Sequence, residues 1–430
     1  MELTELGYDK KSAACSAYTD DKLLWNRPAS GYFKGIVPPH YPTILNLNWQ
    51  NNPENDGHGL VMLFQYHHWL HRGKNPEVVK ARWKYIQPAA EYLVWAVTNP
   101  DLSKSKSGGI LFSATEAVAE LFAGGYNIYC DETCRLGLLG YAEMADAIGE
   151  SEKASLWRSI ADKMRTAISQ YYGGTDEKYG TVWDDAKTRS TWGTSSGASL
   201  FIGMDYLGFD IAATLSPEWL TRARNSYRRH LDNTNPRYFI GGGVGYNQCF
   251  LTQTALLIDQ IADAEQMLNW ISKFTYDPRH RPFIVPELAF PVPDGQVGTR
   301  IHDLGNAVQE AEAIKCLRIV LGVDDYQPEC VKLMPRIPFS WTGVKVRNYP
   351  VITRDKDKVV TRLLNYNYAR AKSGLMKMEI NYDGELTQLK VRVGPFPSSF
   401  KNVNAKISSG TPAKPGGVKI DKNNDLIISG

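Results

Sequence analysis

The chain has 430 residues, of which 43% are hydrophobic, and its 49 basic residues nearly balance its 46 acidic ones. A chain of this size can bury a large core, and it exceeds the usual single domain unless the architecture is a helical toroid or a large barrel. Because the charges balance and no long run of either sign occurs, the chain lacks the basic patch that binds nucleic acid or an anionic membrane, and both are excluded as partners. We therefore expect a small partner of little charge.

The sequence shows no recognisable targeting or membrane-spanning segment. No stretch approaches the length of apolar sequence that spans a bilayer, and the start, MELTELGYDKKSAACS, resembles neither a signal peptide nor a transit peptide. We expect a soluble protein, cytoplasmic, or secreted or periplasmic after loss of a signal. Six cysteines in so long a chain are not a disulfide framework, so we expect buried thiols, including Cys130 and Cys134, and no metal or cofactor.

Helical periodicity dominates the first three quarters of the chain. One helix start is explicit, because Ser216 suits an N-cap, Pro217 the first helical position and Glu218 the first turn. Glycines mark the expected left-handed helix ends, at Gly73, Gly149, Gly173, Gly208 and Gly322. Candidate helices cover residues 56–72, 77–98, 127–149, 152–172, 191–207, 216–232, 245–261, 263–275 and 302–321.

The connections between these helices alternate between long and short. Long loops precede the helices that start near residues 56, 127, 191, 245 and 302, so they fall on one end of the bundle. Those helices are rich in Gly, Ala, Ser, Cys and Thr, which suits a tightly packed inner ring, whereas their partners are amphipathic with charged outer faces. The pattern predicts a mainly α fold, an (α/α) toroid of helical hairpins, although a plain helical bundle would also bury these faces.

After about residue 328 the pattern changes to short alternating runs, VKVRNYPV, LMKMEINY and LKVRVG, separated by turn residues. These runs predict a small antiparallel β domain over residues 328–430. The toroid is expected over residues 35–327, and residues 1–34 are an N-terminal extension or a truncated first hairpin.

The five long loops and the helix starts behind them hold most of the chemistry. Carboxylates could bind hydroxyls and transfer protons, and aromatic faces could stack on the C–H faces of pyranose rings, so the combination predicts a saccharide pocket on one rim. The candidate ligand-binding residues are Trp49, Asp56, His58, Tyr126, Asp131, Trp183, Asp184, Trp192, Tyr246, Gln248, Arg300, His302 and Asp303.

Two stretches and the tail carry a family resemblance. The stretches are GGYNIYCDETCRLGLLGYAEMADAIG and VPELAFPVPDGQVGTRIHDLGNAVQEAEAIKCLRIVLG, and the tail reads P-R-I-P-x-x-W. With the hairpin layout, they resemble the six-hairpin glycoside hydrolases, the group of glucoamylase-like and α-L-rhamnosidase-like enzymes, over roughly residues 35 to 350. The resemblance implies that the toroid is an (α/α)6 barrel. The resemblance implies hydrolysis of glycosidic bonds in oligosaccharides by an inverting pair of carboxylates, without a cofactor, and a homo-oligomer is compatible with it.

The resemblance also implies where the two carboxylates lie. It places the general acid in the loop of the third hairpin and the general base in that of the sixth, which gives Glu116 as acid and Glu287 as base. Phe112 and Phe122 are expected to raise the pKa of Glu116 if they close over it. Rivals remain open, namely Glu120, Asp131 and Glu132 for the acid and Asp303 for the base, and Asp131 suits an N-cap or a sugar-hydroxyl contact equally well.

Two departures from the family leave other functions open. Residues 1–34 are too short for the β-sandwich that many of these enzymes carry ahead of the barrel, and only five inner helices are clear. One alternative is a sugar epimerase or polysaccharide lyase on the same toroid, with His58 and His302 at the mouth. The other is a carbohydrate-binding protein without catalysis.

Overall fold

The computed structural model describes two compact units, which comprise Met1–Ser195 with Ser199–Gly203, and Ser196–Ala198 with Met204–Gly430. We call them the first and the second unit and describe each by itself. None of the helices in the described part of the chain is long and apolar enough to cross a membrane. The described residues are 55–112, 126–184, 186–187, 208–233, 246–276, 285–291, 297–304, 307–355, 358–371, 376–384, 389–395, 418–420 and 426–429.

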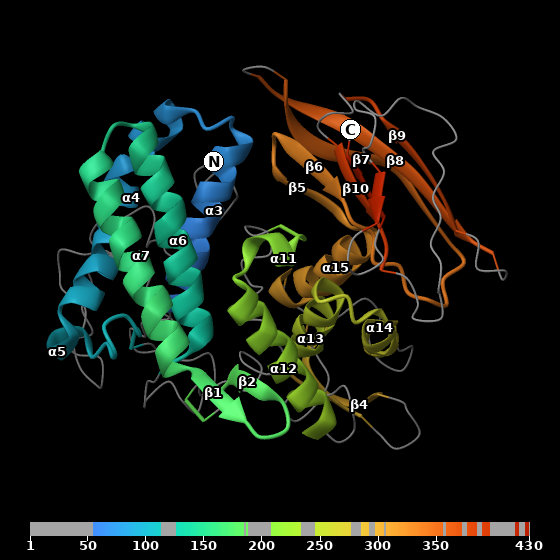
Figure 1. The fold of residues 1–430 in the computed structure, drawn as a ribbon, viewed down its shortest axis with the longest axis horizontal. Coiled ribbons are helices and arrows are strands. Elements are labelled where there is room, and N and C mark those ends of the chain that lie inside the picture. The colour runs from blue at the N-terminus through green and yellow to red at the C-terminus, as the bar shows by residue number, and fades with distance from the viewer. Residues whose placement is uncertain are drawn as a thin grey trace. The chain divides into compact units, whose positions relative to one another are not determined.

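The first unit is a bundle of helices that ends in a short β-hairpin (Figure 1). In the figure α3, α4, α6 and α7 lie side by side, and the hairpin follows α7 directly. The elements are α3 (Asn55–His71), α4 (Pro76–Thr98), α5 (Pro100–Ser103), α6 (Ile128–Ala147), α7 (Ser151–Tyr171), β1 (Gly173–Asp176) and β2 (Gly180–Trp183).

Helices α3 and α6 pack unusually closely, and glycines make this possible. A Cβ on Gly59 would lie 2.4 Å from the backbone nitrogen of Cys134, and a Cβ on Gly140 would lie 2.6 Å from Cγ of Tyr66. Gly59, early in α3, lies against Cys134, early in α6, and the later Tyr66 lies against the later Gly140. Helices α3 and α6 therefore run in the same direction. This agrees with the prediction that both are inner helices whose N-termini lie on one rim.

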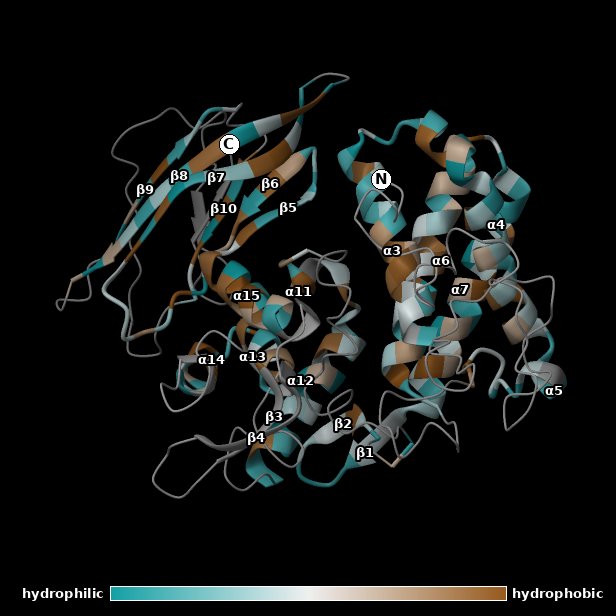
Figure 2. Ribbon diagram, turned by 180° about the vertical axis from the view of Figure 1, so that it is seen from behind, coloured by the Kyte–Doolittle hydropathy of each residue, from teal (hydrophilic) through white to brown (hydrophobic). Residues whose placement is uncertain are grey.

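The partner helices α4 and α7 are amphipathic, as predicted. Helix α7 buries Trp157, Ile160, Met164 and Ile168 at helical spacing and turns charged residues outward. Figure 2 shows hydrophobic and hydrophilic residues interleaved along α4 and α7. The link between α6 and α7 is a tight turn at Gly149, whose φ of +87° is the left-handed conformation expected there. Helices α6 and α7 therefore form an antiparallel hairpin.

The second unit combines helices with two sheets (Figure 1). The helices are α11 (Ile211–Thr214), α12 (Pro217–Asn233), α13 (Tyr246–Leu257), α14 (Ile261–Tyr276) and α15 (Ala307–Leu321), and a hairpin of β3 (Pro286–Pro291) and β4 (Val297–Leu304) precedes α15. A five-stranded sheet has the order β11 (Val418–Ile420), β12 (Leu426–Ser429), β10 (Leu389–Val393), β6 (Cys330–Leu333) and β5 (Val323–Gln327). A three-stranded antiparallel sheet contains β7 (Gly343–Asp355), β8 (Lys358–Arg370) and β9 (Met376–Tyr382).

A buried ion cluster ties the sheets to the helices within the second unit. Arg336, in the P-R-I-P segment, donates from Nε to Oδ1 of Asp259 at 3.1 Å and from Nη2 to the carbonyl of Phe209 at 2.7 Å. Arg392 of β10 contacts both carboxylate oxygens of Asp259, at 2.9 and 2.7 Å. Burial alone would raise the pKa of Asp259, but the two guanidiniums outweigh it and lower that pKa. The P-R-I-P segment therefore helps to hold the five-stranded sheet against the helices of the second unit.

The predicted mainly α fold with a following β domain is observed, with several corrections. The helix expected over 302–321 begins at Ala307, because residues 297–304 form β4 instead. Gly173 does not end α7 in a left-handed turn but begins β1 after the C-cap Tyr172. Strand β5 begins at Val323, ahead of the runs that predicted the β domain, and the five-stranded sheet is not purely antiparallel, since β10 pairs with β6 in parallel. The helix expected at 191–207 lies outside the described residues.

The closed ring itself stays a prediction. In the second unit, Sγ of Cys316 contacts the carbonyl of Cys249 at 3.4 Å, and Nε2 of Gln253 donates to the carbonyl of Glu312 at 3.0 Å. Later residues of α13 thus meet earlier residues of α15, so these helices run in opposite directions at their contact. In a regular toroid both would start at the same rim. The domain limits at residues 34 and 327 likewise remain predictions.

Candidate functional site

The candidate residues are described to different extents. Three of them, Glu116, Trp49 and Trp192, lie outside the described residues, as do Glu120 and Phe122. Six others are placed by secondary structure, with side chains outside the described part of the chain. These are Asp56 in α3, Tyr246 in α13, Glu287 in β3, and Arg300, His302 and Asp303 in β4.

The β3–β4 hairpin brings three predicted residues to one place. Pro286 pairs with Leu304 and Leu288 pairs with Ile301, so Glu287 lies opposite the two residues His302 and Asp303. Where two residues of one strand face a single residue of its partner, the pairing contains a β-bulge. Such a bulge bends the strand, redirects side chains and is common beside active sites. The candidate base and its rival Asp303 therefore share one bulge. Between the two strands the sequence reads Pro-Asp-Gly at 293–295, a combination typical of turns that could have indicated this hairpin.

In the first unit, the predicted residue with the most buried polar contacts, Asp131, lies in the first turn of α6. Asn127 caps this helix, and its side chain accepts from the backbone nitrogen of Tyr129 at 2.9 Å. Asp131 is therefore not the N-cap. Its carboxylate is fully buried, and Oδ1 accepts from the backbone nitrogen of Leu111 at 2.7 Å while Oδ2 accepts from the hydroxyl of Tyr172 at 2.7 Å. Asp131 thus joins α6 to the end of α7 and to the segment that precedes residues 113–125.

Burial dominates the electrostatics of Asp131. It raises the pKa of the carboxyl to about 8, although the hydrogen bonds from Tyr172 and Leu111 act in the opposite direction. The pKa of the Tyr172 hydroxyl is also raised well above its usual value, first by burial and then by the neighbouring Asp131. At neutral pH the carboxyl therefore holds its proton, which is an unusual property that concentrates at functional sites.

Residues 112 and 126 form the two ends of the stretch that contains Glu116, and we call this pair the loop neck. The rings of Phe112 and Tyr126 contact each other edge to face with centroids 5.7 Å apart. Nδ2 of Asn55 donates to the carbonyl of Phe112 at 3.0 Å, and the hydroxyl of Tyr126 donates to the carbonyl of Lys104 at 2.9 Å. Asp131 also holds Leu111. The residues on both sides of the intervening segment, Phe112 and Tyr126, are therefore fixed by hydrogen bonds and ring packing.

Glu132, a rival for the acid, is committed to an ion pair. Its side chain is fully buried, and both carboxylate oxygens accept from Arg135 at 2.7 and 2.6 Å. A guanidinium fork matches a carboxylate in such a bidentate pair. Both carboxylate oxygens of Glu132 are therefore engaged by Arg135 within the protein, which does not favour Glu132 as the acid.

Three further candidates lie in the interior. His58 is buried, donates from Nε2 to the carbonyl of Ala89 at 3.0 Å, and has its pKa lowered to about 4 by burial. Trp183 is fully buried, so its ring presents no face for stacking, and we leave it out of the site proposed below. Gln248 is buried on α13, and within the described ranges neither polar atom of its amide has a hydrogen-bond partner.

Two candidates keep contact with solvent. Tyr126 is partly exposed at the loop neck, and Asp184 is partly exposed after β2, where Oδ1 accepts from the backbone nitrogen of Ala186 at 3.0 Å. The predicted core thiols are confirmed, since Cys130 and Cys134 are buried and are not joined in a disulfide. Sequence reasoning missed two residues: Asn55, which donates to Phe112 of the loop neck, and Tyr172, which donates to Asp131.

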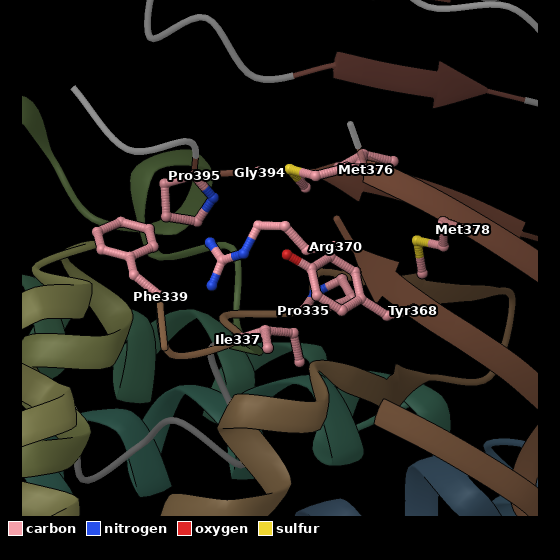
Figure 3. Close-up of a pocket in the computed structure, with 10 residues that line it drawn as sticks. Pro335, Ile337, Phe339, Tyr368, Arg370, Met376, Met378, Gly394 and Pro395 are labelled. Carbon is pink, nitrogen blue, oxygen red and sulfur yellow. The ribbon is translucent and has the colours of Figure 1, made fainter. Parts of the chain in front are cut away.

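A pocket in the second unit lies beside the P-R-I-P segment, between Phe339, Arg370 and Met376 (Figure 3). Nη2 of Arg370 already donates to the carbonyls of Pro338 and Trp341, at 3.1 and 3.2 Å. The space amounts to about 20 Å³, roughly the room that one water molecule needs. This pocket is therefore too small for a sugar ring.

The fold is similar to that of two solved structures. One is the GH78 family rhamnosidase of Bacillus sp. GL1, with a TM-score of 0.52 and 13% identity over 79% of this chain and 33% of that chain. The other is the α-L-rhamnosidase from Dictyoglumus thermophilum, with a TM-score of 0.53 and 10% identity over 97% of this chain and 42% of that chain. No family model and no curated protein sequence matches the chain. The likeness therefore concerns the fold, and the chain spans 33% and 42% of the length of those two proteins.

Proposed function

We propose that the protein is a glycoside hydrolase that cleaves α-L-rhamnosidic bonds of oligosaccharides. The observation that carries the proposal is the fold likeness to two structures described as rhamnosidases, one of which covers 97% of this chain. At 10% and 13% identity that likeness concerns the fold. The activity and the substrate are therefore inferences, supported by the carboxylates of the long loops.

We assign the general base to Glu287 and the general acid to Glu116. The bulge of the β3–β4 hairpin supports the first assignment, because it puts Glu287 opposite His302 and Asp303 on a paired strand rather than in an unsupported loop. The loop neck supports the second, because fixed ends restrict where the segment that carries Glu116 can lie. We propose inversion, in which the acid protonates the leaving oxygen while the base activates a water on the opposite face of the sugar ring.

Asp131 has a supporting role in this proposal. Its carboxyl is enclosed and donates or accepts only within the protein, so it does not reach a glycosidic oxygen from its present position. It fixes Leu111 one residue before the loop neck. Asp131 is thus a positioning residue for the acid-bearing segment, and Asp56, Asp184, Arg300, His302 and Asp303 are proposed contacts to sugar hydroxyls.

The test is a panel of p-nitrophenyl glycosides that differ only in the sugar. We expect release of nitrophenol from the α-L-rhamnoside and little from the α-D-glucoside or β-D-galactoside. Proton NMR should identify the first-formed sugar as the inverted anomer. No hydrolysis of any glycoside in the panel would refute the activity, and hydrolysis of another sugar would refute the substrate.

Variants test the assignment of the two carboxylates. Glu116→Gln should lose about 100-fold or more in kcat/KM on substrates with poor leaving groups and less on dinitrophenyl glycosides, because these depart without full protonation. Glu287→Gln should be equally impaired on both substrates. Glu152→Gln changes an exposed carboxylate on α7 and serves as the matched control, which should keep full activity. Retained activity in Glu287→Gln would move the base to Asp303.

A further inference from the structure

Two lysines and two tyrosines from separate segments meet beside the loop neck, and we call them the lysine–tyrosine cluster. The ammonium of Lys106 lies 4.2 Å from the ring centroid of Tyr126, and that of Lys187 lies 5.5 Å from the ring centroid of Tyr171. The two tyrosine rings are themselves in contact, with centroids 5.9 Å apart and planes inclined by 60°. Two segments whose contacting tyrosines are 45 positions apart in sequence therefore build one surface.

The rings of the cluster are held in place from behind. The hydroxyl of Tyr126 donates to the backbone of Lys104, and its ring packs edge to face on Phe112. Tyr171 packs edge to face on the buried Tyr172, with centroids 5.0 Å apart. A ring that stacks here meets side chains already fixed in orientation, so little side-chain entropy is lost on binding.

The cluster carries the positive charge of two ammoniums. Lys106 and Lys187 are exposed, and neither ammonium contacts a carboxylate in the part of the chain that the structure describes. A third ammonium, that of Lys104, lies 5.2 Å from the centroid of Phe112. Beneath them Asp131 is enclosed and protonated at neutral pH, which leaves Asp184 as the described carboxylate on the same turn as Lys187.

We propose that the lysine–tyrosine cluster is a subsite for an acidic sugar residue, a pyranose that carries a carboxylate, within the substrate of the hydrolase. The C–H face of such a ring suits an aromatic face, and its carboxylate suits two ammoniums. The inference rests on the proposed function and adds the class of saccharide. A polyanion such as nucleic acid does not fit, because the whole chain has a net charge of only +3 and no extended basic stripe.

The proposal is tested with a charged probe and a neutral probe of the same shape. The charged probe is trigalacturonate, and the neutral one is its methyl ester, which keeps the rings but removes the carboxylate charges. Isothermal titration calorimetry with the full chain at low salt should give roughly tenfold tighter binding of the acid, from two exposed ion pairs. About 0.5 M salt should remove most of that preference by screening.

Variants separate this site from general charge effects. The double variant Lys106→Gln/Lys187→Gln should bind the acid and the ester equally, whereas Lys106→Arg/Lys187→Arg should keep the preference. Lys178→Gln is the matched control, because its ammonium also lies over a tyrosine, 4.7 Å from the centroid of Tyr179, on the β1–β2 turn outside the cluster. It should bind as the unmodified protein does.

The outcomes distinguish this subsite from the proposed hydrolase. Equal binding of acid and ester, binding of neither, or an unchanged preference in the double glutamine variant would each overturn the subsite. Hydrolysis of the neutral p-nitrophenyl α-L-rhamnoside is measured separately with the unmodified protein, and it would stand in all three cases. Acid-selective binding without hydrolysis of any glycoside would instead refute the proposed function and retain an acidic-saccharide site.

Discussion

Asp131 gives the sharpest test of the structure, through the substitution Asp131→Asn. An amide has nearly the shape of a protonated carboxyl. Its oxygen can accept from the backbone nitrogen of Leu111, and its nitrogen can donate to the hydroxyl of Tyr172, so the two observed contacts have counterparts. The variant removes only the ability to ionise, which isolates the electrostatic contribution of the buried carboxyl.

The sign of the pH effect follows from the raised pKa. The carboxyl titrates near 3.8 in the unfolded chain and at about 8 in the folded one, so between these values the folded state holds a proton that the unfolded state has released. Stability of the unmodified protein therefore falls as pH rises through this window, by about 1.4 kcal/mol per pH unit. Between pH 5 and pH 8 the loss amounts to about 4 kcal/mol. The asparagine variant lacks this loss.

The assay is thermal unfolding followed by tryptophan fluorescence at pH 5 and at pH 8. Trp157 and Trp183 are buried in the same unit as Asp131 and report on its unfolding. For a unit of this size the change in relative Tm should be roughly 8 to 15 °C, with the variant gaining on the unmodified protein at the higher pH. Other titrating groups cancel, because they are shared by the two proteins.

Asp162→Asn is the control, because this exposed carboxylate lies on α7 in the same unit. It should follow the unmodified protein at both pH values. A constant gap in Tm between Asp131→Asn and the unmodified protein from pH 5 to pH 8 would refute the reasoning, since it would mean that Asp131 is ionised throughout.

Three other substitutions test the packing and the buried charges. Gly59→Ala should lower the Tm, because its Cβ would lie 2.4 Å from backbone, and overpacking of about 1 to 3 kcal/mol outweighs a helix-propensity gain of about 1 kcal/mol; Gly57→Ala, with open space around its Cβ, should be neutral or slightly stabilising. Asp259→Asn should lower the urea midpoint of the second unit by the equivalent of about 3 kcal/mol, because the buried Arg336 loses its carboxylate partner. Glu132→Gln should lower the Tm of the first unit for the same reason, and an unchanged Tm would mean that its arginine partner is solvated after the change.

The helices could be predicted because their signals are local. Helical periodicity and the Ser-Pro-Glu start fixed α12 within one residue, and Oγ of Ser216 accepts from the backbone nitrogen of Trp219 at 3.3 Å, as an N-cap does. The glycine at 322 ends α15 with a φ of +71°, as its residue type predicts. Each of these signals acts within a few residues of the structure it determines.

The two hairpins inside the predicted loops were missed because their strands are short and lack apolar alternation. Strand β1 reads GGTD, and its pairing with β2 depends on the turn that joins them rather than on a hydrophobic face. Strand β3 contains two prolines, Pro286 and Pro291, which argue against a strand when read alone. Pairing with β4 and the bulge at Glu287 arise from the partner strand, which a reading of one segment does not include.

The role of Asp131 could not be read from its own position, because the contacts that decide it are remote in sequence. From the first turn of an inner helix, a carboxylate that reaches solvent would bind a ligand, and one that is enclosed would hold neighbouring backbone. Tyr172, 41 residues away, and Leu111, 20 residues away, enclose it here. Since the same two contacts fix the start of the segment that carries Glu116, a change at Asp131 that spares stability at pH 5 but lowers kcat without raising KM would identify it as a positioning residue rather than a ligand contact.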